Sequence, residues 1–304
     1  MKIAIETFSL TKRYHTSCAV DSLNMKVPAG SIYGFLGPNG AGKSTTMKMI
    51  LGLAKPNSGS VKLLGCTVNE KNRLEVLSRT GSLIESPSYY GHLTGRENLQ
   101  IVAMLKGVQE KEIDEVLRIV RMENQQKKKV SQYSLGMKQR LGLACALLGK
   151  PEVLLLDEPT NGLDPAGIQE MRELICSLPE KYGMTVLVSS HLLSEIGQMA
   201  NHAGIIDHGK LIFQGRLDEL HMHSRKNLLL RTHDNEAALH ILQSQKILCQ
   251  NKGGQLLLPE LSDEKTAFLI SALVKEGIGI YRIEEQQKNL EEIFLSLTGK
   301  QVSL

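Results

Sequence analysis

The stretch that most constrains this chain is a phosphate-loop pattern near its N-terminal end. The pattern is Gly, four residues, then Gly-Lys-Ser, and it is filled by Gly37, Pro38, Asn39, Gly40, Ala41, Gly42, Lys43 and Ser44, with Thr45 behind them. Glycines let the backbone wrap a phosphate closely, and successive N–H groups offer it positive potential. The pattern therefore predicts a site for a nucleoside triphosphate.

The residues on either side supply the strand and helix that such a loop needs. Residues 31–36 predict a short buried strand, and residues 45–53 predict a helix whose N-terminus adds positive potential. We expect Lys43 to contact the β- and γ-phosphates and the Ser44 hydroxyl to ligate Mg²⁺. The alternative is a glycine-rich turn that happens to precede a helix, and the paired strand and helix disfavour it.

A second pattern places two carboxylates after an apolar run. Residues 153–156 are all apolar, which suits a strand buried on both faces of a parallel sheet, and Asp157 and Glu158 follow directly. Ligands bind at this end of the strands in open α/β sheets. We expect Asp157 to help hold Mg²⁺ and Glu158 to polarise the attacking water. A plain exposed strand end is the alternative.

Two further residues join this site as candidates. Residues 185–188 predict another buried strand, and His191 follows it, so the histidine is expected at the same edge of the nucleotide-binding sheet. Tyr14 lies between two predicted strands near the N-terminus. Its spacing alone fits either an aromatic ring stacked on adenine or a half-buried residue of a sheet.

Composition excludes several other classes of function. The net charge is +4 and aromatic residues are 4% of the chain, with no tryptophan, so a nucleic-acid groove is not expected. The five cysteines are widely spaced and form no CxxC pair, which indicates free thiols. Neither a signal peptide's apolar core nor a bilayer-spanning apolar run is present, so any membrane crossing is expected from another chain.

The order of predicted elements indicates two domains. Residues 1–222 carry the site: strands within 2–30, a strand over 76–84, a helical part over about 86–150 and a hairpin over 203–213. Residues 223–304 predict a small α+β domain with helices at 235–243, 262–275 and 289–297. The histidines near its start have no cysteine or carboxylate cluster beside them, so a polar linker explains them better than a metal site.

With these motifs placed, the first 220 residues resemble the ATP-binding subunit of an ABC transporter. The resemblance rests on the order of the Walker A loop at 37–45, a signature segment at 133–140, Walker B at 153–157 with Glu158, a D-loop at 161–164 and the switch residue His191. It implies an α/β P-loop NTPase core of the ABC type with an antiparallel β subdomain and a helical subdomain. The stretch from Leu156 to Pro165 is close to diagnostic alone.

The resemblance also implies a mechanism and partners. Two copies, or a copy and a related subunit, would sandwich two ATP molecules. Ser134 and the amide of Gly136 would reach the γ-phosphate in trans, and Asp164 would couple the two sites. Glu158 would act as the base, His191 would sense the γ-phosphate, and Tyr14 would stack on adenine. Separate transmembrane permease subunits would bind the dimer at the cytoplasmic face of a bacterial membrane.

Two departures from the family pattern refine the prediction. The signature has Tyr133, Leu135 and Met137 where Leu-Ser-Gly-Gly-Gln has Leu, Gly and Gln, but it keeps the serine and the second glycine. The loop that usually carries glutamine has Glu85, which could still ligate Mg²⁺. A glutamate there, and the tail at 290–298, resemble exporters of bacitracin-like peptides and lantibiotic-immunity proteins. ATPase subunits for another cargo, and soluble ABC ATPases, are the alternatives.

Overall fold

The computed structural model describes residues 2–85, 87–222, 226–245 and 247–287. The chain divides into two compact units, 1–217 and 218–304. The boundary expected between residues 222 and 223 falls just beyond this division, at the end of helix α8 (Leu217–Met222). The division into a domain over residues 1–222 and a small accessory domain over residues 223–304 stays a prediction.

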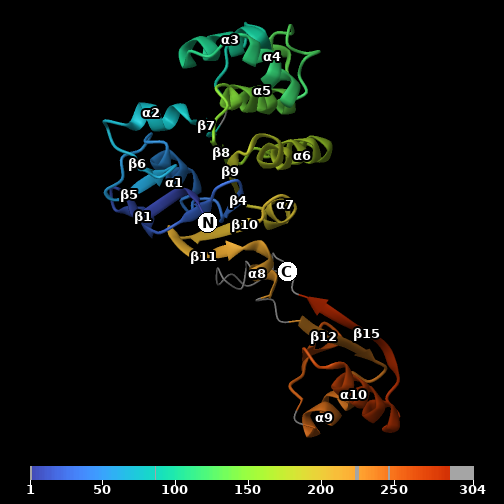
Figure 1. Cartoon of the computed structure of the whole chain (residues 1–304). Coiled ribbons are helices and arrows are strands. Elements are labelled where there is room, and N and C mark those ends of the chain that lie inside the picture. The colour runs from blue at the N-terminus through green and yellow to red at the C-terminus, as the bar shows by residue number, and fades with distance from the viewer. Residues whose placement is uncertain (1, 86, 223–225, 246, 288–304) are drawn as a thin grey trace. The chain divides into compact units, whose positions relative to one another are not determined.

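A six-stranded sheet forms the centre of the first unit (Figure 1). Its order is β11-β10-β4-β9-β8-β7, and every neighbouring pair except β10–β11 is parallel. The strands are β4 (Ile32–Leu36), β7 (Thr80–Leu83), β8 (Val153–Asp157), β9 (Thr185–Ser190), β10 (His202–Asp207) and β11 (Lys210–Arg216). This parallel arrangement brings the carboxyl ends of β4, β8 and β9 to one edge.

An antiparallel sheet lies beside the central one and shares its core. It has the order β2-β1-β5-β6, with β3 also paired to β1, and it confirms the predicted β subdomain. Its strands are β1 (Ile3–Tyr14), β2 (Ser17–Leu23), β3 (Lys26–Pro28), β5 (Ser58–Leu63) and β6 (Cys66–Thr67). Buried side chains from these strands pack with Met47 and Ile50 of helix α1 and with Leu155 and Leu187 of the central sheet.

Helices cover both faces of the central sheet and form a separate group at one end of the unit (Figure 1). They are α1 (Lys43–Ile50), α2 (Arg73–Ser78), α3 (Gly95–Lys106), α4 (Lys111–Ile119), α5 (Leu135–Leu147), α6 (Pro165–Tyr182) and α7 (Leu193–Gly197), with a 3₁₀ turn at Val130–Gln132. The group at one end is α3, α4 and α5, as the helical range predicted. A capping box begins α3, because the Thr94 side chain accepts the N–H of Glu97 and the Glu97 carboxylate accepts the N–H of Thr94.

Two expected elements differ from the structure. Residues 76–84 are not one strand, because α2 occupies Arg73–Ser78 and only β7 is extended; the Leu, Glu and Arg content of residues 73–78 favours a helical turn with Val76 buried. The helix expected over 45–53 starts at Lys43 and ends at Ile50. Gly52 has a φ of 65°, a left-handed conformation that ends the helix.

The second unit has the order β-α-β-β-α-β, the split βαβ pattern of ferredoxin-like folds. Its elements are β12 (Lys226–Thr232), α9 (Asn235–Ser244), β13 (Gln250–Lys252), β14 (Gln255–Pro259), α10 (Asp263–Lys275) and β15 (Ile280–Gln287). All pairs in the sheet β13-β14-β12-β15 are antiparallel. The expected α+β architecture is therefore observed, and the helix predicted at 289–297 lies outside the described residues.

Candidate nucleotide site

The phosphate loop connects β4 directly to α1, as expected from the sequence. Gly40 and Gly42 have φ values of 81° and 109°, which side-chain-bearing residues rarely adopt. A Cβ on Gly37 would lie 2.4 Å from the carbonyl oxygen of Ile206, and one on Gly42 would lie 2.4 Å from that of Ala19. Close backbone packing therefore requires glycine at 37 and 42, and the left-handed backbone favours it at 40 and 42.

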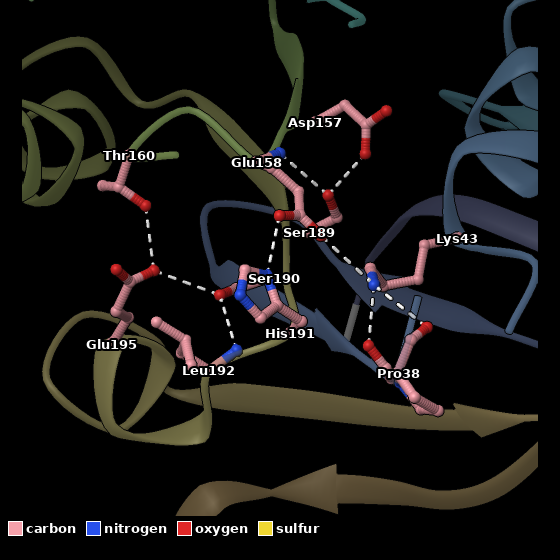
Figure 2. A network of polar contacts seen from close by, with 11 residues as sticks. Pro38, Lys43, Asp157, Glu158, Thr160, Ser189, Ser190, His191, Leu192 and Glu195 are labelled. Carbon is pink, nitrogen blue, oxygen red and sulfur yellow. Dashed lines mark hydrogen bonds and ion pairs between the residues drawn. The ribbon is translucent and has the colours of Figure 1, made fainter. Parts of the chain in front are cut away.

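The residues of this loop fit a bound phosphate group. Helix α1 has no side-chain cap at Gly42 and no acidic residue in its first turn, so its N-terminal N–H groups face no competing side-chain acceptor. The Lys43 side chain is buried, and its Nζ donates to the carbonyl oxygens of Gly37 at 2.6 Å and Pro38 at 3.3 Å (Figure 2). Ser44 and Thr45 are half-buried beside it. An uncapped helix terminus and a buried ammonium together suit a polyanion.

The paired carboxylates are held by a serine that sequence reasoning missed. The buried Ser189 hydroxyl, at the end of β9, donates to Asp157 Oδ1 at 2.6 Å and accepts the backbone N–H of Glu158 at 2.9 Å (Figure 2). Glu158 has a φ of 48°, a left-handed conformation that redirects its side chain after the straight strand β8. Ser189 therefore fixes both the metal candidate and the backbone of the base candidate.

The Glu158 carboxylate contacts one residue with each oxygen. Its Oε1 lies 3.2 Å from Lys43 Nζ, and its Oε2 lies 2.7 Å from His191 Nδ1 (Figure 2). Three segments that are far apart in the sequence therefore meet here, as the strand-end argument predicted. We call Lys43, Asp157, Glu158, Ser189 and His191 the catalytic edge.

A magnesium ion would need more ligands than the protein supplies. Ser44 and Asp157 offer a hydroxyl and a carboxylate, and no group of three or more His, Cys, Asp or Glu residues in the described chain could hold a metal. Mg²⁺ commonly binds through one or two protein oxygens together with nucleotide phosphates and water. The donor set therefore fits Mg²⁺ that arrives with a nucleotide.

Glu85, the third metal candidate, is paired with a lysine. Its Oε1 accepts a hydrogen bond from Lys48 Nζ at 2.5 Å, and this bond raises the pKa of Lys48 above its usual value. Glu85 also has a φ of 60° at the end of β7, so its backbone turns sharply there. Its carboxylate is accordingly engaged with α1, and its role as a metal ligand stays a prediction.

Tyr14 ends β1 and is 46% exposed. The ammonium of Lys12 lies 4.9 Å from the centre of its ring, a distance typical of a cation–π contact. The exposed ring surface is compatible with stacking on a base, and its role as the adenine-stacking residue stays a prediction.

The three remaining candidates share a different hollow. Ser134 caps α5 by accepting the N–H of Met137 at 3.3 Å, and Asp164 caps α6 by accepting the N–H of Gly167 at 3.0 Å. Both line one hollow of about 650 Å³ with Gly136, and none of residues 37–45 is among the described residues that line it. We call Ser134, Gly136 and Asp164 the signature face.

The departure at Tyr133 has a structural explanation. Its side chain is buried, and its hydroxyl donates to the carbonyl oxygen of Gln125 at 2.7 Å. A Cβ on Gly95 would lie 2.3 Å from that hydroxyl, so the absence of a side chain at Gly95 makes room for the ring. Burial raises the pKa of the Tyr133 phenol, which keeps it a neutral donor. Tyr133 therefore anchors the start of the signature segment.

The loop after β4, the carboxylates after β8 and the parallel sheet define the class of P-loop nucleoside triphosphatases. The family described as ABC transporter matches residues 20–161. The bacitracin transport ATP-binding protein BcrA of Bacillus licheniformis is 44% identical over 302 residues, which are 98% of this chain and 98% of that protein. This chain belongs to the ATP-binding proteins of ABC transporters, and it is therefore an ATPase that binds adenine nucleotide.

Two further relatives define the extent of the similarity. The lantibiotic transport ATP-binding protein SrtF of Streptococcus pyogenes is 45% identical and covers 69% of this chain and 90% of its own length. A dimeric structure of a bacterial ABC transporter cassette is 25% identical, has a TM-score of 0.64, and covers 70% of this chain and 98% of its own. The resemblance to bacitracin and lantibiotic transport proteins is confirmed, and the BcrA match extends into the second unit. Across the described residues, no helix combines the length and apolarity needed to span a bilayer.

Proposed function

We propose that this chain is the ATPase subunit of an exporter that confers immunity or resistance to an antimicrobial peptide, either a lantibiotic or a bacitracin-like peptide. The observation that carries the proposal is the 44% identity to a bacitracin transport ATP-binding protein across 98% of both chains. SrtF, which is named for lantibiotic transport, matches this chain over 90% of its own length. This match supports the same class of substrate.

In this proposal the catalytic edge performs hydrolysis. Lys43 and the N-terminus of α1 bind the β- and γ-phosphates, and Ser44 and Asp157 hold Mg²⁺, with Glu85 as a further candidate ligand. Bound Mg²⁺ would neutralise charge on the phosphates. Glu158 orients and deprotonates the attacking water, and His191 holds the Glu158 carboxylate through the 2.7 Å contact and senses the γ-phosphate.

We propose that the signature face completes the site of a second copy. Ser134 and Gly136 stand at the N-terminus of a 13-residue helix, where N–H groups attract an anion. They line a hollow without the phosphate loop of their own chain, so a γ-phosphate on this face would come from another chain. Asp164 lies at the same hollow and would couple the two sites. The dimeric cassette among the solved relatives supports this assembly.

Separate permease subunits would carry the peptide through the membrane, with the ATPase dimer bound at the cytoplasmic face. The described residues contain no helix that could span a bilayer, which is consistent with a peripheral position. Tyr14 would stack on adenine and orient the nucleotide in each half of the dimer.

The test combines a trapping variant with a sensitivity panel. Glu158→Gln is expected to lower ATP hydrolysis by about 100-fold or more while ATP binding and dimerisation persist, because it removes the base and keeps the shape. Cells of the native host carrying this variant should lose resistance to bacitracin or a lantibiotic and keep their resistance to unrelated antibiotics. Glu123→Gln is the matched control, since Glu123 is exposed and lies outside the site.

The two parts of the proposal fail in different ways. Unchanged hydrolysis in Glu158→Gln would disprove the role of this residue as the base. Loss of hydrolysis without any change in peptide sensitivity would instead disprove the substrate class and favour another cargo.

A further inference from the structure

A glutamate outside the family motifs joins two loops of the site. Glu195 lies on the short helix α7, and its Oε2 accepts hydrogen bonds from Thr160 Oγ1 at 2.8 Å and from Ser190 Oγ at 3.1 Å (Figure 2). Thr160 follows β8 and Ser190 ends β9. One carboxylate oxygen therefore connects the segments that leave two neighbouring strands of the sheet.

Each of these segments carries a residue of the proposed mechanism. Thr160 leads from Glu158 into the D-loop, which ends at Asp164, and Ser190 directly precedes His191. The Ser190 hydroxyl also accepts the N–H of Leu192 at 3.0 Å, so it shapes the turn in which His191 sits. The contacts of Glu195 therefore reach both loops through Thr160, two residues after Glu158, and Ser190, next to His191.

The two residues that donate to Glu195 are buried, and Glu195 itself is half-buried. Thr160 is 5% exposed and Ser190 is 4% exposed. Hydrogen bonds to a charged group are stronger than neutral ones, and they gain further where water is excluded. Without the carboxylate, both hydroxyls would have to find other acceptors in a buried place.

Helix α7 packs against the central sheet. Leu193 and Ile196 are buried, and a Cβ on Gly34 of β4 would lie only 2.1 Å from Ile196 Cγ2. The glycine in β4 therefore lets α7 pack directly on the sheet. Tyr33 and Phe35, on either side of Gly34, pack into the core shared with α1, so α7 covers the opposite face from the phosphate-loop helix.

We propose that Glu195 is a positioning residue that keeps the D-loop and the His191 loop in one fixed relation. This inference rests on the roles proposed above for His191 and Asp164. Through Thr160 it places the start of the D-loop, and through Ser190 it places the turn of His191, so a shift of one loop is transmitted to the other. Glu195 touches neither nucleotide nor water in this assignment, and its effect passes entirely through these two hydroxyls.

The experiment measures the kinetics of ATP hydrolysis by the full chain. Glu195→Ala and Thr160→Val are each expected to lower kcat by about 10- to 100-fold, because small misplacements of catalytic groups have effects of this size. The KM for ATP should change less than threefold or so, because the phosphate loop is untouched. Thr160→Ser restores the hydroxyl and should restore kcat. The double variant Thr160→Val/Glu195→Ala should be no slower than the slower single variant.

Controls separate positioning from stability and from the proposed function. Ser194→Ala, on an exposed position of the same helix, should match the wild-type rate, and thermal melts of all variants show whether any loss of kcat follows loss of fold. Wild-type kcat in Glu195→Ala, multiplicative losses in the double variant, or no recovery in Thr160→Ser would each overturn the proposal. Glu158→Gln tests the base separately, and its outcome leaves the comparison of Glu195 with the wild type unaffected.

Discussion

The catalytic edge and the signature face differ in how their polar side chains are held in place. At the catalytic edge, each side chain contacts a residue from a distant segment: Lys43 and His191 each contact one oxygen of Glu158, and Ser189 joins Asp157 to the Glu158 backbone. On the signature face, Ser134 and Asp164 accept hydrogen bonds from N–H groups of the helices they begin. The first region is a network closed within one chain, whereas the second is a pair of helix starts around an open hollow.

The difference shows which part of the site one chain can build alone. A closed network fixes the carboxylates and the lysine before any partner binds, so it supplies preorganisation. The helix N-termini at the open hollow attract an anion. The phosphate loop of the same chain, however, does not line this hollow. The comparison therefore predicts that defects in the two regions can be complemented between chains.

The sharpest test of this comparison mixes two inactive variants. Lys43→Ala should abolish hydrolysis through the phosphate loop, and Gly136→Asp should do so by placing a negative charge at the start of α5. If each site combines the two regions from different chains, a mixed dimer keeps one intact site. Random pairing should then restore about a quarter of the wild-type hydrolysis, measured as phosphate release after mixing.

Two features make the mixing result decisive. A Cβ at Gly136 meets its first neighbour, Leu163 Cδ2, at 3.8 Å, so the substituted chain has room to fold, and melting curves check this. The double variant Lys43→Ala/Gly136→Asp mixed with wild type serves as the control. If the two regions act in trans, each site of its mixed dimers combines one altered region with one unaltered region, so no intact site remains. No recovery in the single-variant mixture would show that the two regions do not act in trans.

The next prediction weakens the closed network from inside. Ser189→Ala removes the donor to Asp157 and the acceptor of the Glu158 N–H, and should destabilise the fold by about 1–3 kcal/mol because Ser189 and Asp157 are buried. Hydrolysis should fall by about tenfold or more, because Glu158 loses the bond that fixes its left-handed backbone. Urea unfolding and steady-state kinetics measure the two effects.

The control for Ser189 is a serine with a local bond only. Ser177 donates to the carbonyl oxygen of Leu174 within α6, so Ser177→Ala should leave the hydrolysis rate unchanged. Equal rates for Ser189→Ala and wild type would mean that the strand ends alone hold the carboxylates.

The parts of the site that the sequence predicted are those fixed by backbone geometry. The glycine spacing at 37–42 and the apolar run before Asp157 each demand one local structure, and parallel strands then bring their ends together. Helix α6 was not anticipated, although Asp164, Pro165 and Gly183 are the start and stop signals of a helix. Of these three residues, only Asp164 was interpreted as part of the D-loop.

The contacts that escaped prediction depend on tertiary packing. The sequence does not show that Thr160 donates to Glu195 or that Ser189 donates to Asp157, because these partners lie 35 and 32 residues apart. The sequence offered one signal of such contacts, namely polar residues at the ends of otherwise apolar strands. The pairing of Glu85 with Lys48 likewise joins a loop to a helix 37 residues earlier.

The smallest expected effect concerns Glu85, which belongs to neither region. Lys48→Met and Glu85→Gln should show a coupling free energy of at most about 1 kcal/mol in a double-mutant cycle on urea unfolding, because both side chains are accessible to solvent. The coupling should shrink as salt is raised. A carboxylate that instead acts mainly as a metal ligand would give no coupling in the nucleotide-free chain.

The direction of the Lys48 pKa shift gives this pair a pH signature. The bond to Glu85 raises the pKa of the folded-state ammonium, so its contribution is fully present below the ordinary lysine value of about 10.4 and is lost as pH rises through the raised value. The stability difference between wild type and Lys48→Met should therefore be constant from pH 7 to about pH 10. A difference that disappeared within this range would show that Lys48 is not held by Glu85, and would make Glu85 available to the catalytic edge.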